Sequence, residues 1–475
     1  MRHWTILTLL TGLSASTFGR AADLPSVVVL LADDLGSGDL GCYNPKSQIP
    51  TPNLDRLARA GLRCTDAHSP SGVCTPTRYG LLTGQYSWRT RLKSGVFAGY
   101  DIPLIDANRM TSASLFKKHG YATACVGKWH LGLGMAKPTD YDRLLSPGPR
   151  SVGFDYFFGI PASLDMVPYV YVENEKVLAA PTEKIADSKS QREGGDGFFR
   201  GGPIAPGFKH DEVLTRCTDR AVGWLEEQAK TRPGKPFFLY YPLTGPHTPW
   251  LPSGDFVGKS KAGAYGDFVV QTDAAIGRVL DALDRLKLTD TTLVIATSDN
   301  GAHWLPADIR KFDHRANLHY RGQKADIHEG GHRVPFLARW PGTIEPNTTS
   351  AATFGLVDLL ATCAEVVGEK LPANAGEDSV SIMPVLRGKP FARPPLVMHS
   401  AQGVFAIRKG SWKLVDGLGS GGFTAPAKVE PQPGGPTGQL YHLVDDPEEK
   451  TNRFLEKPEV VKELTEALAK VKAGR

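Results

Sequence analysis

The stretch SVVVLLADD, residues 26–34, joins an unbroken run of valine and leucine to two acidic residues. A continuous apolar run of this length predicts a strand that is buried on both faces of a sheet. TTLVIATSDN, residues 291–300, repeats the pattern and ends in Asp299 and Asn300. The sequence therefore predicts buried strands whose carboxyl ends carry polar side chains.

Around these strands the chain alternates predicted helices with predicted strands. Helices are expected over residues 51–61, 111–120, 211–230 and 264–286, and further strands over residues 121–130 and 236–243. Alternation of this kind favours an α/β fold, in which helices sandwich a large and mainly parallel sheet.

The last hundred residues have a different pattern. Residues 395–400, 404–410 and 411–417 read as short strands separated by turns, and residues 458–474 as a closing helix. We therefore expect a catalytic α/β domain over residues 22–380 and a smaller C-terminal subdomain, an antiparallel sheet plus a helix, over residues 381–475. Residues 187–212 read as a long insertion with little periodicity.

The N-terminus has the features of a targeting segment. A short basic start precedes the apolar residues 4–18, and the small residues of GRAA, residues 19–22, suit cleavage. The prediction is a signal peptide over residues 1–21 and an exported protein, periplasmic or secreted, that is not held in a membrane after cleavage. A retained membrane anchor is the alternative.

The charge and the cysteine spacing argue against some classes of function. The chain has 55 basic and 50 acidic residues, a net charge of +5. Loss of Arg2 and Arg20 with the signal peptide would leave +3 (5 − 2). The absence of a Lys/Arg block in the sequence argues against a nucleic-acid groove, whereas an anionic substrate is compatible with this charge. The six cysteines lack the paired spacing of zinc or redox sites.

Polar residues recur where the predicted strands end. They are Asp33, Asp34, Lys128, His130, His247, Asp299 and Asn300. Each alone is most simply a turn, cap or surface residue. Several together at equivalent strand ends favour one shared site, because open α/β sheets bind ligands at the carboxyl ends of their strands.

The chemistry of this set is specific. Asp33, Asp34, Asp299 and Asn300 offer only oxygen ligands, which suit calcium or magnesium rather than zinc. Basic side chains able to hold an anion accompany them, among them Arg78, Lys128 and Lys324. A hard cation beside basic residues suits an enzyme that acts on phosphate or sulfate esters.

CTPTRYGLLTG, residues 74–84, resembles the Cys-x-Pro-x-Arg signature of the type I, formylglycine-dependent sulfatases, which are arylsulfatase-like members of the alkaline phosphatase superfamily. The resemblance extends in family order over nearly the whole chain after the signal peptide. It is carried by LADDLG (31–36), TPNLDRLARAG (51–61), GKWHLG (127–132), PHTPW (246–250), TSDNG (297–301), GQKADIHEGG (322–331) and LYHLVDDPEEKTN (440–452).

The resemblance implies a cofactor set. A formylglycine-generating, sulfatase-maturing enzyme would oxidise Cys74 to formylglycine (3-oxoalanine). One calcium ion would be held by Asp33, Asp34, Asp299, Asn300 and an oxygen of the modified Cys74. Cys74 is also expected to precede a helix, whose N-terminal amides and dipole would favour anionic oxygen there.

The resemblance also implies residue roles. Arg78 and Lys128 would hold the hydrated aldehyde and the sulfate, and His130 would hydrogen-bond the aldehyde hydroxyls. One hydroxyl would attack sulfur, and the second would then expel the sulfate. His247, with Lys324, would protonate the leaving alcohol. Ser163 is the candidate for a serine near the sulfate.

The expected substrate is an O-sulfated carbohydrate, attacked at a chain end. The insertion offers Arg200, Lys209 and His210 for carboxylates or hydroxyls, and Phe198 and Phe199 for a sugar face. Trp250 and Trp304 are expected to form an aromatic wall, with a packing role as the alternative. The competing functions are a phosphodiester or phosphonate monoester hydrolase on the same fold, a non-catalytic binder of sulfated glycans, and a cysteine hydrolase.

Overall fold

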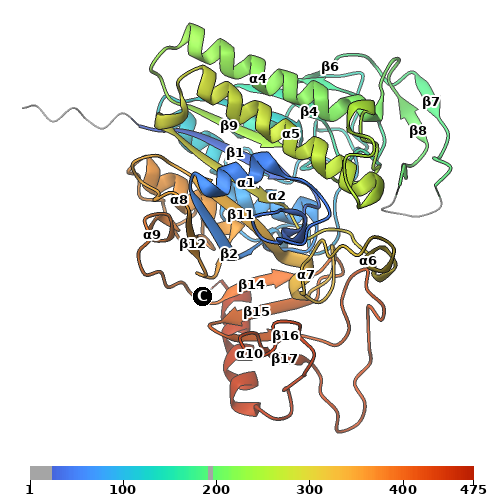
Figure 1. The fold of residues 1–475 in the computed structure, drawn as a ribbon, viewed down its shortest axis with the longest axis vertical. Coiled ribbons are helices and arrows are strands. Elements are labelled where there is room, and N and C mark those ends of the chain that lie inside the picture. The colour runs from blue at the N-terminus through green and yellow to red at the C-terminus, as the bar shows by residue number, and fades with distance from the viewer. Residues whose placement is uncertain (1–23, 191–195, 475) are drawn as a thin grey trace, which may run out of the picture.

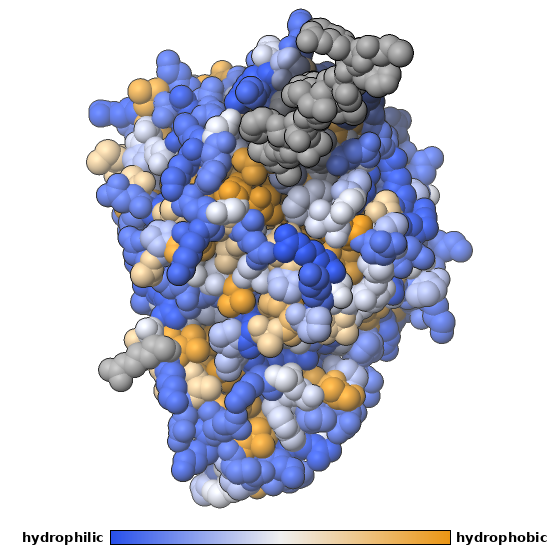
Figure 2. Space-filling model, turned by 90° about the vertical axis from the view of Figure 1, so that its left-hand side faces the viewer, coloured by the Kyte–Doolittle hydropathy of each residue, from blue (hydrophilic) through white to orange (hydrophobic). Residues whose placement is uncertain are grey.

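The computed structural model describes residues 24–190 and 196–474. The predicted signal peptide and residues 191–195 of the predicted insertion lie outside these residues. Among the described residues, no helix is long and apolar enough to cross a membrane. One face of the molecule is mostly hydrophilic, with apolar residues scattered over it (Figure 2).

A large twisted sheet forms the centre of the molecule (Figure 1). Its strands lie in the order β12 (Thr348–Ser350), β2 (Leu62–His68), β11 (Arg333–Arg339), β10 (Thr292–Ser298), β1 (Ser26–Ala32), β9 (Phe237–Pro242), β3 (Ala122–Lys128), β4 (Tyr156–Ile160), β5 (Val172–Glu173) and β6 (Lys176–Val177). The five strands from β10 to β4 are parallel to one another, and β11 is antiparallel to both of its neighbours. The strand β13 (Phe354–Gly355) also pairs with β2. The predicted α/β fold is confirmed.

Helices cover both faces of this sheet. On one side α1 (Pro52–Arg59), α4 (Val213–Thr231) and α5 (Gly263–Arg285) pack together, and on the other α2 (Cys74–Thr83), α3 (Ser112–Lys118) and α8 (Leu359–Val366) do so. All seven residues of β1 are buried, as a strand covered on both faces requires. The helix α2 is buried along its whole length, so it lies inside the molecule rather than on it. The short helices α6 (Pro306–Phe312), α7 (Glu329–His332) and α9 (Met383–Leu386) lie in the connections.

A second, antiparallel sheet follows near the C-terminus. Its strands β14 (Leu396–His399), β15 (Phe405–Lys409), β16 (Trp412–Val415) and β17 (Gln439–His442) pair in chain order, and α10 (Pro458–Lys472) packs on β15 and β16. These elements have a hydrophobic core of their own. The expected small sheet with one helix is therefore present.

Buried ion pairs join the two sheets. Arg408 of β15 contacts Asp66 of β2 at 2.9 Å, and Lys413 of β16 contacts Glu329 of α7 at 3.0 Å. Lys413 also pairs with Glu449 at 2.9 Å. Because every partner is buried, loss of one would leave an uncompensated charge. The C-terminal sheet is thus fixed against the large sheet.

The prediction that residues 187–212 form an irregular insertion is partly wrong. Residues Gly202–Ile204 form β8, which pairs antiparallel with β7 (Glu183–Ile185). Strands of three residues are too short to show an alternating pattern in the sequence.

Candidate active site

Two neighbouring strands deliver four of the predicted site residues to one place. β1 and β10 are parallel, and their register pairs Ala32 with Ser298. The residues that follow therefore leave the sheet side by side. The backbone N–H of Asp34 donates to Asp299 Oδ1 at 3.3 Å, and Asn300 Nδ2 donates to Asp34 Oδ1 at 2.6 Å.

Arg78 connects these acids to the end of β3, which lies beyond β9 in the sheet. Its Nε donates to Asp299 Oδ2 at 3.1 Å, and its Nη2 donates to Asp33 Oδ2 at 3.1 Å. Its Nη1 donates to the backbone oxygen of Lys128 at 2.8 Å. The guanidinium is completely buried, so it is held in one position by charge-assisted bonds.

Two lysines complete the charge balance. Lys128 Nζ lies 2.5 Å from Asp33 Oδ2, and Lys324 Nζ lies 2.8 Å from Asp34 Oδ2. Burial opposes the charge of Asp33, but Lys128 and its cationic neighbours hold the pKa of Asp33 well below its usual range. Burial, together with the charge of Asp33, raises the pKa of Asp299 to about 6.

Cys74 is the first residue of α2 and lies within this cluster. It is 2% exposed, and its Sγ lies 3.7 Å from Asp33 Oδ1. Burial raises the pKa of the Cys74 thiol far above its usual range, and Lys128 offsets only part of this rise. A neutral thiol beside a carboxylate is a poor nucleophile, which counts against the cysteine hydrolase.

Two histidines stand at different points of the cluster. His247 Nδ1 donates to the backbone oxygen of Thr248 at 2.6 Å, and its Nε2 lies 3.8 Å from Asp34 Oδ2. Burial and the nearby Lys324 lower the pKa of His247 to about 3. His130 Nε2 donates to the backbone oxygen of Phe97 at 2.7 Å, and its Nδ1 has no hydrogen-bond partner among the described residues.

The cluster is approached from one side. Arg78 and Asp299 have no exposed side-chain surface, whereas the side chains of Lys324 and His247 are 10% and 6% exposed. A ligand would thus meet Lys324 and His247 before the deeper residues. Ser163 is buried near the end of β4, and its Oγ has no hydrogen-bond partner among the described residues.

Most of the residues predicted to contact the sugar have other partners. Trp250 and Trp304 are buried and pack against Tyr265, with ring centroids 5.1 and 4.7 Å from it, so the predicted aromatic wall is wrong and the packing role holds. Lys209 pairs with Glu212 at 2.8 Å. His210 is buried and stacks on Phe199, with ring centroids 4.5 Å apart. Closeness in sequence to a site does not decide whether an aromatic side chain faces a ligand or packs in the core, where its large apolar area is also stabilising.

Arg200 is the exception, because its partner is an aspartate that lies beside the site. Its guanidinium pairs with the buried carboxylate of Asp165, whose Oδ1 lies 3.9 Å from His247 Nδ1. Sequence analysis missed Asp165, since it follows β4 by five residues and no pattern separates it from a turn residue.

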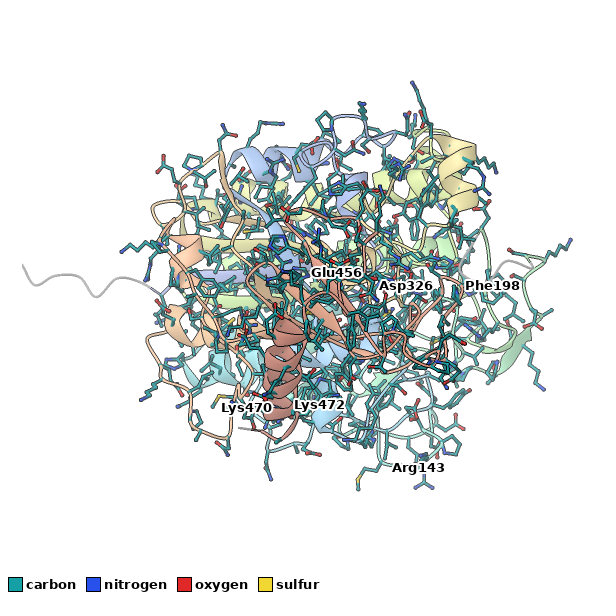
Figure 3. The ribbon with its side chains drawn as sticks, turned by 90° about the horizontal axis from the view of Figure 1, so that it is seen from below. Arg143, Phe198, Asp326, Glu456, Lys470 and Lys472 are labelled. Atoms are coloured by element: carbon teal, nitrogen blue, oxygen red, sulfur yellow. The ribbon has the colours of Figure 1, made fainter. Side chains whose placement is uncertain are left out.

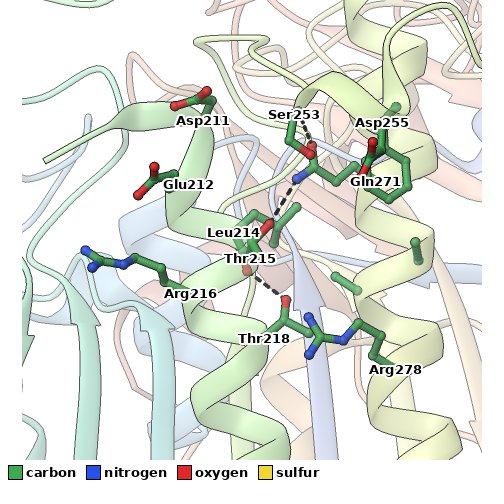
Figure 4. Close-up of a pocket in the computed structure, with 13 residues that line it drawn as sticks. Asp211, Glu212, Leu214, Thr215, Arg216, Thr218, Ser253, Asp255, Gln271 and Arg278 are labelled. Atoms are coloured by element: carbon green, nitrogen blue, oxygen red, sulfur yellow. Dashed lines mark hydrogen bonds between the residues drawn. The ribbon is translucent and has the colours of Figure 1, made fainter.

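A separate groove lies between α4 and α5 (Figure 4). It has a volume of about 460 Å³ and is lined by polar residues such as Thr215, Gln271 and Arg278. None of the candidate site residues lines it, and Thr215 and Gln271 hydrogen-bond each other at 3.4 Å. The groove is therefore separate from the buried charged cluster.

Comparison with known proteins agrees with this geometry. The sulfatase family model matches residues 25–369. An N-acetylgalactosamine-6-O-sulfatase from Bacteroides thetaiotaomicron is 36% identical over 505 residues, covering 98% of this chain and 97% of the relative. Arylsulfatase A from Bos taurus is 36% identical over 427 residues, covering 86% of this chain and 77% of the relative.

A solved structure extends the similarity to three dimensions. A Bacteroides thetaiotaomicron protein, reported in connection with glycosaminoglycan metabolism, superposes with a TM-score of 0.85 at 34% identity. The match covers 95% of this chain and all of that one. The family match, the relatives and the buried charged cluster agree: the chain belongs to the sulfatase family and is a sulfuric ester hydrolase.

Proposed function

We propose that this protein is an exo-acting sulfatase of O-sulfated carbohydrate that uses formylglycine made from Cys74 and one calcium ion. The observation that carries the proposal is the buried cluster in which Asp33, Asp299 and Arg78 surround Cys74 at the start of α2. The relative named for N-acetylgalactosamine 6-O-sulfate supports a sulfated N-acetylhexosamine of galacto configuration as the substrate. Because the site is almost wholly buried, it suits a terminal sugar better than the middle of a chain.

The residues of the cluster fit a hard cation. Asn300 Oδ1 is buried and has no hydrogen-bond partner among the described residues, so it is an acceptor without a donor. With the carboxylates of Asp33, Asp34 and Asp299 it offers oxygen ligands, which calcium prefers. When bound, calcium would supply positive charge to the sulfate and to the modified side chain at position 74.

Each of the remaining residues would act either on the sulfate and the nucleophile or on the leaving group. Arg78 and Lys128 lie on the Asp33 side, where they would bind sulfate oxygens and hold the modified Cys74 in place. His130 would accept a proton from a hydroxyl of the modified side chain at position 74. His247 and Lys324 lie on the accessible Asp34 side. The negative charge of a bound sulfate would raise the low pKa of His247, so that His247, with Lys324 beside it, would donate a proton to the departing alcohol. Ser163, with its unpartnered Oγ, would hydrogen-bond the sulfate.

The test combines mass spectrometry with a substrate screen. Protein from a host with a formylglycine-generating enzyme should carry an aldehyde at position 74, and Cys74→Ala should abolish turnover while the protein stays folded. Sulfate release is then measured across sulfated monosaccharides, oligosaccharides and aryl sulfates, with phosphodiesters as controls. Fully active protein with an unmodified thiol, or activity on phosphodiesters alone, would overturn the proposal.

Metal analysis tests the cation separately. Asp299→Ala should remove both bound calcium and activity. The variant removes an oxygen ligand and also the partner of two Arg78 bonds. Stoichiometric zinc in active enzyme, or active enzyme free of metal, would contradict a calcium site.

A further inference from the structure

Asp165 carries a buried hydrogen-bond acceptor that the fold leaves unused. The residue follows Ser163 by two positions and is 4% exposed. Its Oδ2 pairs with the guanidinium of Arg200, but its Oδ1 has no hydrogen-bond partner among the described residues. Buried carboxylate oxygens normally have a donor, so an oxygen without one points to a partner that arrives from outside.

His247 does not supply that donor. Asp165 Oδ1 lies 3.9 Å from His247 Nδ1, which is beyond hydrogen-bond distance. The backbone oxygen of Thr248 lies 2.6 Å from the same nitrogen. Because a carbonyl can only accept, the Nδ1 proton points to Thr248. The imidazole therefore stands between Asp34 on its Nε2 side and Asp165 on its Nδ1 side.

This position lies toward the accessible side of the site. The side chain of Arg200 is 42% exposed, whereas that of Asp165 is 6% exposed. Arg200 also lies over the ring of Phe198, 5.4 Å from its centroid. Phe198 lies toward the edge of the molecule that carries β7 and β8 (Figure 3). Asp165 thus stands between the deep cluster and the surface, beside the histidine that serves the leaving group.

We infer that Asp165 is a specificity-determining residue that accepts a hydrogen bond from a hydroxyl of the leaving sugar. The inference rests on the proposed function and adds to it the chemistry of the sugar. A carboxylate oxygen selects a neutral donor, such as a hydroxyl, and repels a second anion. Sugars that carry hydrogen or a second sulfate at that hydroxyl should be poor substrates. A site built to hydrogen-bond a hydroxyl rejects the analogue that lacks it, because its own polar group is then left unpaired.

The test compares two substrates in two variants. One substrate is a sulfated N-acetylhexosamine and the other is an aryl sulfate, which has no hydroxyl. In Asp165→Ala, the ratio of kcat/KM for the sugar to kcat/KM for the aryl sulfate should fall about 100-fold. The matched control is Asp219→Ala, which removes an aspartate that pairs with Arg278 at 2.7 Å on the outer helices. Its ratio should not change.

Calorimetry gives a readout that does not depend on turnover. The sulfated sugar should bind Cys74→Ala protein at least tenfold more tightly than it binds Cys74→Ala/Asp165→Ala protein. If Asp165→Ala lost kcat/KM equally on both substrates, or if both proteins bound the sugar equally, this inference would be overturned. The proposed function would be unaffected. A wild-type enzyme that carries formylglycine yet hydrolyses neither substrate would overturn the proposed function, and this inference with it.

Discussion

The hydroxyl of Thr424 donates a hydrogen bond to the carboxylate of Asp326, two residues after Lys324, and the Thr424 backbone N–H donates to the same carboxylate at 3.0 Å. Asp326 also accepts from the backbone N–H of Gln323 at 3.0 Å. Asp326 lies among the loops beside the C-terminal sheet (Figure 3). Lys324 is therefore presented to Asp34 by a turn that a loop of the C-terminal sheet holds in place.

Thr424→Val should lower activity because it loosens the turn that positions Lys324, although position 424 does not itself contact the substrate. Loss of one donor to a buried carboxylate should cost about 1–2 kcal/mol in the free energy of unfolding. Loosening the turn should lower kcat/KM about tenfold, because small misplacements of a catalytic group are expensive. Steady-state kinetics and denaturant unfolding measure the two effects. The control is Thr231→Val, which removes a hydroxyl bonded within the exposed end of α4. Unchanged kcat/KM in Thr424→Val would contradict this role.

The burial of Cys74 predicts that this residue is modified before the chain folds. A side chain that is 2% exposed, inside a helix that is buried throughout, cannot enter the active site of another enzyme. Folded protein with the thiol at position 74 should therefore remain unmodified when incubated with the formylglycine-generating enzyme. A peptide that spans residues 71–84 should be converted under the same conditions. Mass spectrometry of the Cys74 peptide measures both, and conversion of the folded protein would contradict the prediction.

The buried histidine His399 predicts a loss of stability in acid. Burial lowers the pKa of His399 to about 4, against 6.5 when exposed. Its Nδ1 donates to the backbone oxygen of Ser400 at 3.0 Å. The unfolded chain takes up the proton first as the pH falls. The stabilisation is therefore complete above pH 6.5 and is lost as the pH falls toward 4, by up to about 3 kcal/mol.

The measurement for His399 is denaturant unfolding at pH 7.5 and pH 5. His399→Gln should be less stable than wild type at pH 7.5 and should lose less stability between the two pH values. His442→Gln, at a partly exposed histidine of β17, is the matched control and should keep the wild-type difference. An unchanged pH difference in His399→Gln would argue against this origin of acid sensitivity.

The sequence predicted the buried strands and the residues at their ends because both depend on local patterns. A run such as that of β1 is unambiguous, and parallel strands place their following residues at one edge. It did not predict β2 or the antiparallel β11. In β2, polar residues such as Arg63 and Asp66 interrupt the apolar pattern. These side chains are satisfied by partners far along the chain, as Asp66 is by Arg408.

The parts of the site that could not be predicted are those set by tertiary contacts. Whether Trp304 faces a ligand or the core depends on Tyr265, 39 residues earlier in the chain (304 − 265). The unused oxygen of Asp165 can be recognised only once the positions of Arg200 and His247 are known. Residue type gives candidates for a site, but the hydrogen-bond partners decide which of them remain available.

The balance of charge in the cluster makes a last prediction, about how cation and sulfate bind. The three carboxylates of Asp33, Asp34 and Asp299 lie against three cations, Arg78, Lys128 and Lys324. The site is therefore neutral before any ligand enters. A divalent cation alone would leave two uncompensated positive charges in a buried place, which is costly. Sulfate carries two negative charges, so each ligand should favour the other.

Calorimetric titration of calcium into formylglycine-containing protein, with and without inorganic sulfate, measures this coupling. Saturating sulfate should tighten calcium binding about tenfold or more, whereas chloride at equal ionic strength should not. Lys324→Met removes one positive charge and should tighten calcium binding in the absence of sulfate while it shrinks the coupling. Lys209→Met, at an exposed lysine paired with Glu212, is the control and should behave as wild type. Calcium affinity that is independent of sulfate, in wild type and in Lys324→Met alike, would show that the buried charges do not act as one balanced unit.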